Sequence, residues 1–160
     1  MNMKSLVIVS SYHHKNTQKI AETMAKVLDA QTKTPEQSNP QELQEYDLIG
    51  FGSGIDSGKH YKVLLDFANQ LPQITNRRAF IFSTSAIQGE TKVAEDHLAL
   101  REILQSKGYL IAGEFSCLGY NTNSFLKVLG GKNKGRPNTD DLKHAEKFAQ
   151  NLKQSLERPL

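Results

Sequence analysis

The segment SSYHHKNT, residues 10–17, concentrates side chains that can bind an anion. It supplies hydroxyls, an amide, a lysine and two histidines between an apolar run and an amphipathic pattern. Such side chains at the start of a helix, where backbone N–H groups lack helical partners, are suited to a phosphate. A polar connector with solvated histidines is the alternative. We expect a phosphate site formed by Ser11, Tyr12, His13, His14, Lys15, Asn16 and Thr17.

Three more polar segments lie at the ends of apolar runs. They are GSGIDSGKHY (52–61), STSAIQGE (83–90) and CLGYNTNS (117–124). All of them are rich in glycine, serine, threonine or asparagine, and none has the composition of a plain connector. Together with the first segment they are the regions in which a ligand site is expected.

The elements that must position these segments alternate along the chain. Short apolar runs predict strands at residues 4–10, 46–53, 78–83 and 109–117, with a short edge strand near 31–34. Helical spacing predicts helices from Asn16 or Thr17 to about 28, at 59–71, at 90–107 and from about 138 to 156. The alternation predicts one α/β domain over residues 1–160, a parallel sheet with helices on both faces. Ligands of such sheets bind beyond the carboxyl ends of the strands, where the four segments would meet.

Three familiar nucleotide or phosphate motifs are absent. Ser57-Gly58-Lys59 resembles the end of a P-loop, but the position five before Gly58 is Ser53 and His60 follows the lysine. The glycines of the second segment also miss the dinucleotide fingerprint, because the third position is Ile55 or Ser57. A response-regulator receiver needs an acidic pair after the first strand, where this chain has Ser10 and Ser11.

No residue stands out as a catalytic group or metal ligand. His13 and His14 are adjacent, and neighbouring side chains rarely converge on one ion, so we expect no metal. Cys117 ends an apolar strand and His97 shares a helix face with Ala94 and Leu98, so both are predicted to pack in or near the core. The chemistry is therefore expected to come from a bound cofactor.

Composition and charge exclude several classes of protein. The net charge of +3 is spread among acidic residues, which argues against a nucleic-acid partner. No apolar run approaches the length of a membrane span, and the amino terminus is too short in apolar residues for a signal-peptide core. We therefore expect a cytoplasmic protein without membrane insertion.

The first segment resembles the phosphate loop of flavodoxins, in which a Ser/Thr-rich loop ending in Asn-Thr wraps the phosphate of FMN. This resemblance implies a doubly wound, flavodoxin-like parallel sheet of five strands in the order 2-1-3-4-5, with FMN bound without a covalent link. It also implies that two later loops hold the flavin ring. These are Ser53, Gly54, Ile55 and Asp56 in one loop, and Ser83, Thr84, Ser85 and Ala86 in the other. Tyr120 and Asn121, in the fourth segment, are also assigned to FMN.

The chain departs from flavodoxins in several respects. The usual loop has three residues between its leading Ser/Thr and Asn-Thr, so here either Tyr12 leads or Ser11 leads with one residue extra. Flavodoxins are typically acidic and often stack a tryptophan on the flavin, whereas this chain is mildly basic and has no tryptophan. The aromatic residues available for stacking are Tyr12, His60, Tyr61 and Tyr120.

A basic stretch, GGKNKGRPN at residues 130–138, has two interpretations. It is either a surface loop leading into the last helix or a cationic patch of Lys132, Lys134 and Arg136 near the flavin. Such a patch would attract an acidic redox protein or the phosphate of NAD(P)H. We favour an electron carrier that works with redox partner proteins, and the alternative is an NAD(P)H-dependent FMN oxidoreductase that reduces a quinone or another small acceptor.

Overall fold

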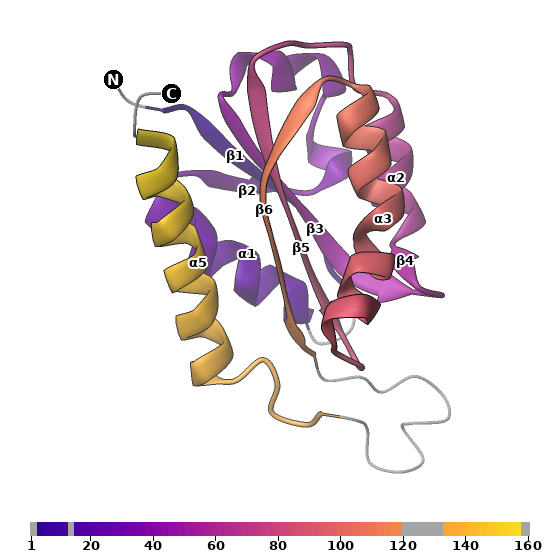
Figure 1. Ribbon diagram of the computed structural model, residues 1–160, viewed down its shortest axis with the longest axis vertical. Helices are drawn as coiled ribbons and strands as arrows, with labels where there is room; N and C mark the ends of the chain where they lie inside the picture. Colours follow the sequence, from indigo (N-terminus) through magenta and orange to yellow (C-terminus); the bar gives the residue numbers. More distant parts are fainter. Residues whose placement is uncertain (1–2, 13–14, 120–132, 158–160) are drawn as a thin grey trace.

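Five parallel strands form the centre of the molecule. The computed structural model describes residues 3–12, 15–119 and 133–157. The strands are β1 (Ser5–Ser10), β2 (Gln31–Lys33), β3 (Leu48–Asp56), β5 (Arg77–Ser85) and β6 (Tyr109–Leu118). They lie in the order β2-β1-β3-β5-β6, as Figure 1 shows. Counted in chain order, these parallel strands have the predicted order 2-1-3-4-5, so the predicted fold is confirmed.

Helices cover both faces of this sheet (Figure 1). They are α1 (Asn16–Leu28), α2 (Lys62–Asn69), α3 (Glu90–Ser106) and α5 (Thr139–Glu157). Two short 3₁₀ helices, Pro35–Gln37 and Pro40–Glu45, precede β3. Within the described part of the chain, no helix has the length and apolarity needed to cross a membrane.

The core consists of two apolar layers, one on each side of the sheet. Side chains of a strand alternate between its faces. Leu6 and Ile8 of β1 accordingly pack in the cluster that includes Leu64 of α2 and Leu104 of α3. Val7 and Val9 instead join the cluster formed with α1 and α5. The hydrophobic pattern in the sequence therefore determines which face of each strand meets which pair of helices.

One serine from each of four strands lies in a single row across the sheet. The register pairs Ser10 with Ser53, Ser53 with Ser83, and Ser83 with Ser116. We call these residues the serine row. The row lies near the carboxyl ends of the strands. Ser10, Ser53 and Ser83 follow apolar side chains that point to the same face, such as Ile8 of β1. It marks where the α2/α3 layer of the core ends and the polar loops begin.

The prediction of a helix beginning at Lys59 is wrong. Ser57 and Gly58 have φ values of 53° and 79°, which allow the tight two-residue turn of a β-hairpin. The turn brings the two-residue strand β4 (Lys59–His60) antiparallel to the end of β3, so the sheet has a sixth strand. The helix therefore begins only at Lys62.

The predicted start of α1 at Asn16 is confirmed, but the expected N-cap role of Asn16 or Thr17 is wrong. Neither Asn16 nor Thr17 caps α1, because Lys15 takes the N-cap position in a left-handed conformation and both residues lie inside the helix. The predicted start of α5 is confirmed. Asn138 Oδ1 accepts from the Asp141 backbone N–H at 2.9 Å, and Asp141 Oδ2 accepts from the Asn138 N–H at 2.7 Å.

We expect Gly52→Ala to destabilise the protein by about 1–3 kcal/mol, the usual cost of overpacking a core. A Cβ at this position would lie 2.2 Å from the ring of Phe82, which is fully buried. Gly113→Ala is the matched control, since its Cβ would lie 3.1 Å from the half-buried ring of Phe148, and a smaller loss is expected. Urea unfolding measures both losses, and equal stability of Gly52→Ala and the parent would contradict this account of the packing.

Candidate functional site

A small cavity lies at the carboxyl ends of the strands, where loops from the four polar segments meet. Its free volume is about 40 Å³, and two of its lining rings, Tyr12 and Tyr61, stack with centroids 4.8 Å apart. The lining residues are Ser11, Tyr12, Asn16, Thr17, Gly54, Ile55, Tyr61, Thr84, Ser85, Ala86 and Gly119. The topology thus brings the predicted segments together as expected for a parallel sheet.

The amino terminus of α1 forms one end of this site. Lys15 has φ 54° and ψ 35° and makes no side-chain cap, and its backbone N–H donates to the Tyr12 carbonyl at 3.3 Å. The first turn of the helix holds no acidic side chain, although acidic residues are common at such ends. The partial positive charge of the helix end is therefore not neutralised by a carboxylate from its own first turn.

A hydrogen bond joins this helix end to the next loop. The hydroxyls of Thr17 and Thr84 lie 2.8 Å apart, and both residues are buried. Because one comes from α1 and the other from the end of β5, the bond fixes the phosphate-type segment relative to the 83–90 segment. It also uses part of the hydrogen-bonding capacity of Thr17.

The β3–β4 hairpin shapes the second wall of the cavity. Ser53 Oγ donates to the Gly54 carbonyl at 2.6 Å and accepts from the Tyr61 N–H at 3.0 Å. A Cβ on Gly54 would lie 2.3 Å from the Tyr61 hydroxyl oxygen, so a glycine is required under this ring. Burial, followed by smaller effects of Asp56 and Tyr12, raises the pKa of Tyr61 above its ordinary value. Tyr61 therefore stays neutral at physiological pH.

The loop after β5 is held by three separate contacts. The Ser85 carbonyl accepts from the Gly119 N–H at 3.0 Å, and the Ala86 carbonyl accepts from Asn133 Nδ2 at 2.9 Å. Ser85 Oγ donates to the Ile87 carbonyl at 2.8 Å. The loop is thus tied both to the end of β6 and to the segment before α5.

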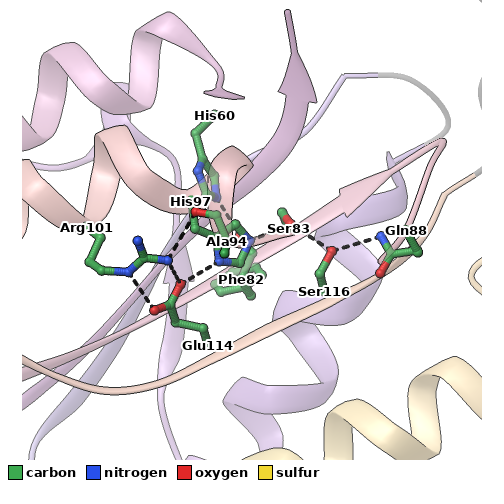
Figure 2. Close-up of polar contacts among 9 residues, drawn as sticks. All are labelled: His60, Phe82, Ser83, Gln88, Ala94, His97, Arg101, Glu114 and Ser116. Carbon is green, nitrogen blue, oxygen red and sulfur yellow. Dashed lines mark hydrogen bonds and ion pairs between the residues drawn. The ribbon is translucent and has the colours of Figure 1, made fainter. Parts of the chain in front are cut away.

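A buried polar network lies behind this loop, between α3 and the sheet (Figure 2). His97 Nδ1 contacts Glu114 Oε1 at 2.8 Å, and its Nε2 lies 2.8 Å from Ser83 Oγ. Arg101 donates to both oxygens of Glu114 at 2.8 Å. The order serine, histidine, carboxylate is that of a hydrolase triad. Ser83 is only 1% exposed and does not line the cavity, so no substrate reaches its hydroxyl and the network is structural.

The pKa values of Glu114 and His60 are both lowered in this region. Burial acts to raise the pKa of Glu114, but hydrogen bonds from His97 and Arg101 outweigh it and lower the pKa to about 2. The His60 and His97 rings lie with centroids 5.0 Å apart and planes tilted by 44°, and Nε2 of His60 lies 2.9 Å from the Phe82 carbonyl oxygen. Burial, followed by the neighbouring His97, lowers the pKa of His60 to about 3. Glu114 is therefore a carboxylate and His60 a neutral ring at pH 7.

The structure separates the predicted site residues into three groups. Those that line the cavity are Ser11, Tyr12, Asn16, Thr17, Gly54, Ile55, Thr84, Ser85 and Ala86. Lys15 and Asp56 are exposed and do not line it, and Ser53 and Ser83 are buried behind it. His13, His14, Tyr120 and Asn121 lie outside the described residues.

Two lining residues were absent from the predicted set. Gly119 follows β6 directly, and a glycine has no side chain from which a binding role could be predicted. Tyr61 was one of several candidate stacking residues. An interpretation of Ser57-Gly58 as a hairpin turn would have placed Tyr61 over Gly54. His60, another candidate, is 1% exposed and packs in the interior, away from the cavity.

The basic stretch is less cationic than its composition suggests. Arg136 donates to both oxygens of Asp141, at 2.5 and 2.6 Å, so its charge is paired. Lys134 is exposed, and Lys132 lies outside the described residues. The contact of Asn133 with Ala86 nevertheless places the start of the described part of this stretch beside the cavity.

We expect the free energy of unfolding to fall as the pH falls below about 6.5. His60 accepts a proton near its ordinary pKa of 6.5 only when the chain is unfolded, because its folded pKa is about 3. Each such proton difference lowers stability by up to about 1.4 kcal/mol per pH unit. Glu114 adds a further loss below pH 4.5, since its folded pKa of about 2 is also depressed.

His60→Gln keeps a polar side chain without a titrating ring and should flatten the loss between pH 6.5 and 4.5. His144→Gln, at an exposed position of α5, is the control that should keep the parent slope. Urea unfolding at a series of pH values measures the slope. An unchanged slope in His60→Gln would show that another group is responsible.

Comparisons with known proteins agree with this fold. A family model described as a flavodoxin domain matches residues 6–119. An uncharacterized protein of Methanocaldococcus jannaschii is 45% identical over 150 residues, which cover 94% of this chain and 98% of that protein. The chain also matches the structure of oxidised flavodoxin 2 from Bacillus cereus with a TM-score of 0.72 and 19% identity, over 95% of this chain and 99% of that one.

A second solved structure with the same fold is the apo form of an NADH:FMN oxidoreductase. Its TM-score is 0.63 at 18% identity, over 98% of this chain and 91% of that one. Identities this low establish the shared fold alone. The match of the family model over most of the chain goes further: this protein belongs to the flavodoxin domain family.

Proposed function

We propose that this protein binds FMN without a covalent link and carries electrons between redox partners. The observation that supports this proposal most directly is the single cavity lined by the start of α1, the end of β3 and the loop after β5. These are the three places where the flavodoxin resemblance puts the FMN phosphate and the flavin ring. FMN would supply the electron-transfer chemistry, and the chain would supply binding and orientation.

The donor set at α1 fits a phosphate. Ser11, Asn16 and Thr17 bring hydroxyl and amide groups to the cavity, next to a helix end without acidic side chains. A phosphate dianion is stabilised by such donors and by the helix dipole. Lys15 is exposed and does not line the cavity, so solvent screening reduces its contribution.

The opposite end fits a flat ring. Gly54 lies directly under the Tyr61 ring, since a Cβ there would lie 2.3 Å from the Tyr61 hydroxyl oxygen. Tyr12 and Tyr61 provide aromatic surface, and their mutual stacking leaves the cavity small. The rings must therefore separate before a flavin can enter. Tyr12 is 60% exposed, so it is the ring that moves at lower cost.

The carrier role is supported by the surface around the cavity. Tyr12 and Ile87 are 60% and 54% exposed, and both belong to loops that shape the site. In this proposal these two side chains would contact the partner protein. The similarity in fold to an NADH:FMN oxidoreductase supports the second candidate, an NAD(P)H-dependent FMN oxidoreductase. In that candidate too, FMN would bind in this cavity.

We expect Ser11→Ala to weaken FMN binding by about 10- to 100-fold, the cost of one hydrogen bond to a charged group. Riboflavin has no phosphate, so its affinity should stay unchanged in this variant. Tyr61→Leu removes ring contact and should weaken FMN and riboflavin by the same factor. Ser38→Ala, at a half-buried serine outside the cavity, is the control for the loss of a hydroxyl.

Quenching of flavin fluorescence measures the affinity of the parent protein and of each variant for FMN and for riboflavin. The phosphate assignment is wrong if Ser11→Ala weakens riboflavin as much as FMN. The proposed function itself fails if the parent protein binds neither flavin.

A second prediction separates the carrier from the reductase. Under anaerobic conditions, NADH or NADPH should bleach the bound flavin only over many minutes, while dithionite bleaches it at once. Absorbance near the flavin maximum follows the reaction, and free FMN with the same nucleotide is the control. Bleaching within seconds, with turnover on a quinone, would replace the carrier by the oxidoreductase and leave FMN binding intact.

A further inference from the structure

Gln88 connects the loop after β5 to the edge strand. Its Nε2 carries two hydrogens and lies within hydrogen-bond distance of three acceptors: Ser85 Oγ at 2.7 Å, Ser116 Oγ at 3.0 Å and the Cys117 carbonyl at 3.2 Å. Ser85 lines the cavity, whereas Ser116 and Cys117 belong to β6 and do not. The side chain therefore bridges the cavity loop and a strand outside the cavity.

Ser116 is anchored in turn by the buried network. Its Oγ lies 2.9 Å from Ser83 Oγ, which lies 2.8 Å from Nε2 of His97. Nδ1 of His97 carries a proton because the Glu114 carboxylate facing it only accepts. Two hydrogen bonds thus fix the ring orientation of a fully buried histidine. Figure 2 shows these side chains in series, from Arg101 to Gln88.

An open groove beside the loop explains why this anchor matters. The groove has a volume of about 430 Å³, and Gln88, Ser116, Glu114 and Arg101 are among its lining residues. Ser116 Oγ is the nearer of the two acceptors that Gln88 has on β6. Gln88 is only half-buried, so without this hydroxyl its amide could turn into the groove and bond to water. The bridge between Ser85 and the sheet would then rest on the longer bond to the Cys117 carbonyl alone.

We propose that Ser116, His97 and Glu114 are positioning residues that hold the cavity loop, residues 85–88, in place through Gln88. The link to flavin rests on the proposed function, because this loop would meet the flavin ring. The positioning itself is a property of the flavin-free protein. The loop geometry would then be set by α3 and β6, two elements whose network residues do not touch the cavity.

Hydrogen–deuterium exchange of the flavin-free protein tests the positioning directly. Ser116→Ala should speed exchange in the segment 84–89 by about 10-fold, because local opening becomes easier when the bridge is lost. Ser116→Thr keeps the hydroxyl and should restore the parent rate. Ser155→Ala removes an exposed serine hydroxyl on α5 that bonds to the Leu152 carbonyl, so it should leave this segment unchanged.

Glu114→Gln tests the remote end of the series. Within the described residues the Glu114 carboxylate bonds to His97 and Arg101 and not to the loop, yet the variant should speed exchange of 84–89 by about 2- to 5-fold through His97. Glu102→Gln, at an exposed position of the same helix as His97, is the charge-matched control and should have no effect. Unchanged exchange in both Ser116→Ala and Glu114→Gln would overturn the proposal.

Flavin affinity gives the second measurement. Ser116→Ala should weaken FMN and riboflavin by the same factor of about 3- to 10-fold, because the loop meets the ring and not the phosphate. A loss confined to FMN would contradict the positioning of a ring loop. If no flavin binds to the parent protein, the proposed function fails while the exchange experiment still decides whether the network holds the loop.

Discussion

The register of the parallel strands is the constraint on which the rest of this structure depends. It sets Ser10, Ser53, Ser83 and Ser116 side by side, so that four strands change from apolar to polar at one level. Below this level the α2/α3 layer is a packed core. Beyond it the chain leaves the sheet in loops that converge on a single cavity. A shift of one residue in any strand would send its serine to the other face and break the row.

The serine row also connects the sheet to the residues that surround the cavity. Each of three serines makes a different connection: Ser53 holds the hairpin that carries Tyr61, Ser83 meets His97, and Ser116 meets Gln88. Hydroxyls are small enough to lie in the core and still satisfy the backbone and side chains that surround them. Glu114 is paired with Arg101, and His60 is neutral. These two ionisable residues beside the serine row therefore add no unpaired charge to the described part of the site.

Local pattern was sufficient to predict the strands and most of the helices, because apolar spacing reflects burial directly. The residues of the first segment that line the cavity follow from the same logic, since they lie between a buried strand and an amphipathic helix. The β3–β4 hairpin was missed because Ser57-Gly58 was interpreted as part of a failed phosphate motif and not as a turn. The network was missed for a different reason. Ser83, His97 and Glu114 are brought together only by the tertiary fold, and His97 lies among residues that suggest simple packing. The composition of the basic stretch likewise could not show that Arg136 pairs with Asp141.

The central claim is that the FMN phosphate lies at the start of α1 and the flavin ring lies between the β3–β4 hairpin and the loop after β5. Titration of ¹⁵N-labelled protein with FMN, followed by amide chemical shifts, tests it most directly. The account predicts shifts concentrated in residues 11–17, 54–61, 84–88 and 119, with riboflavin reproducing all of them except those at 15–17, the start of α1. Shifts centred on the groove between α3 and β6, or identical shifts at residues 15–17 with both ligands, would contradict it.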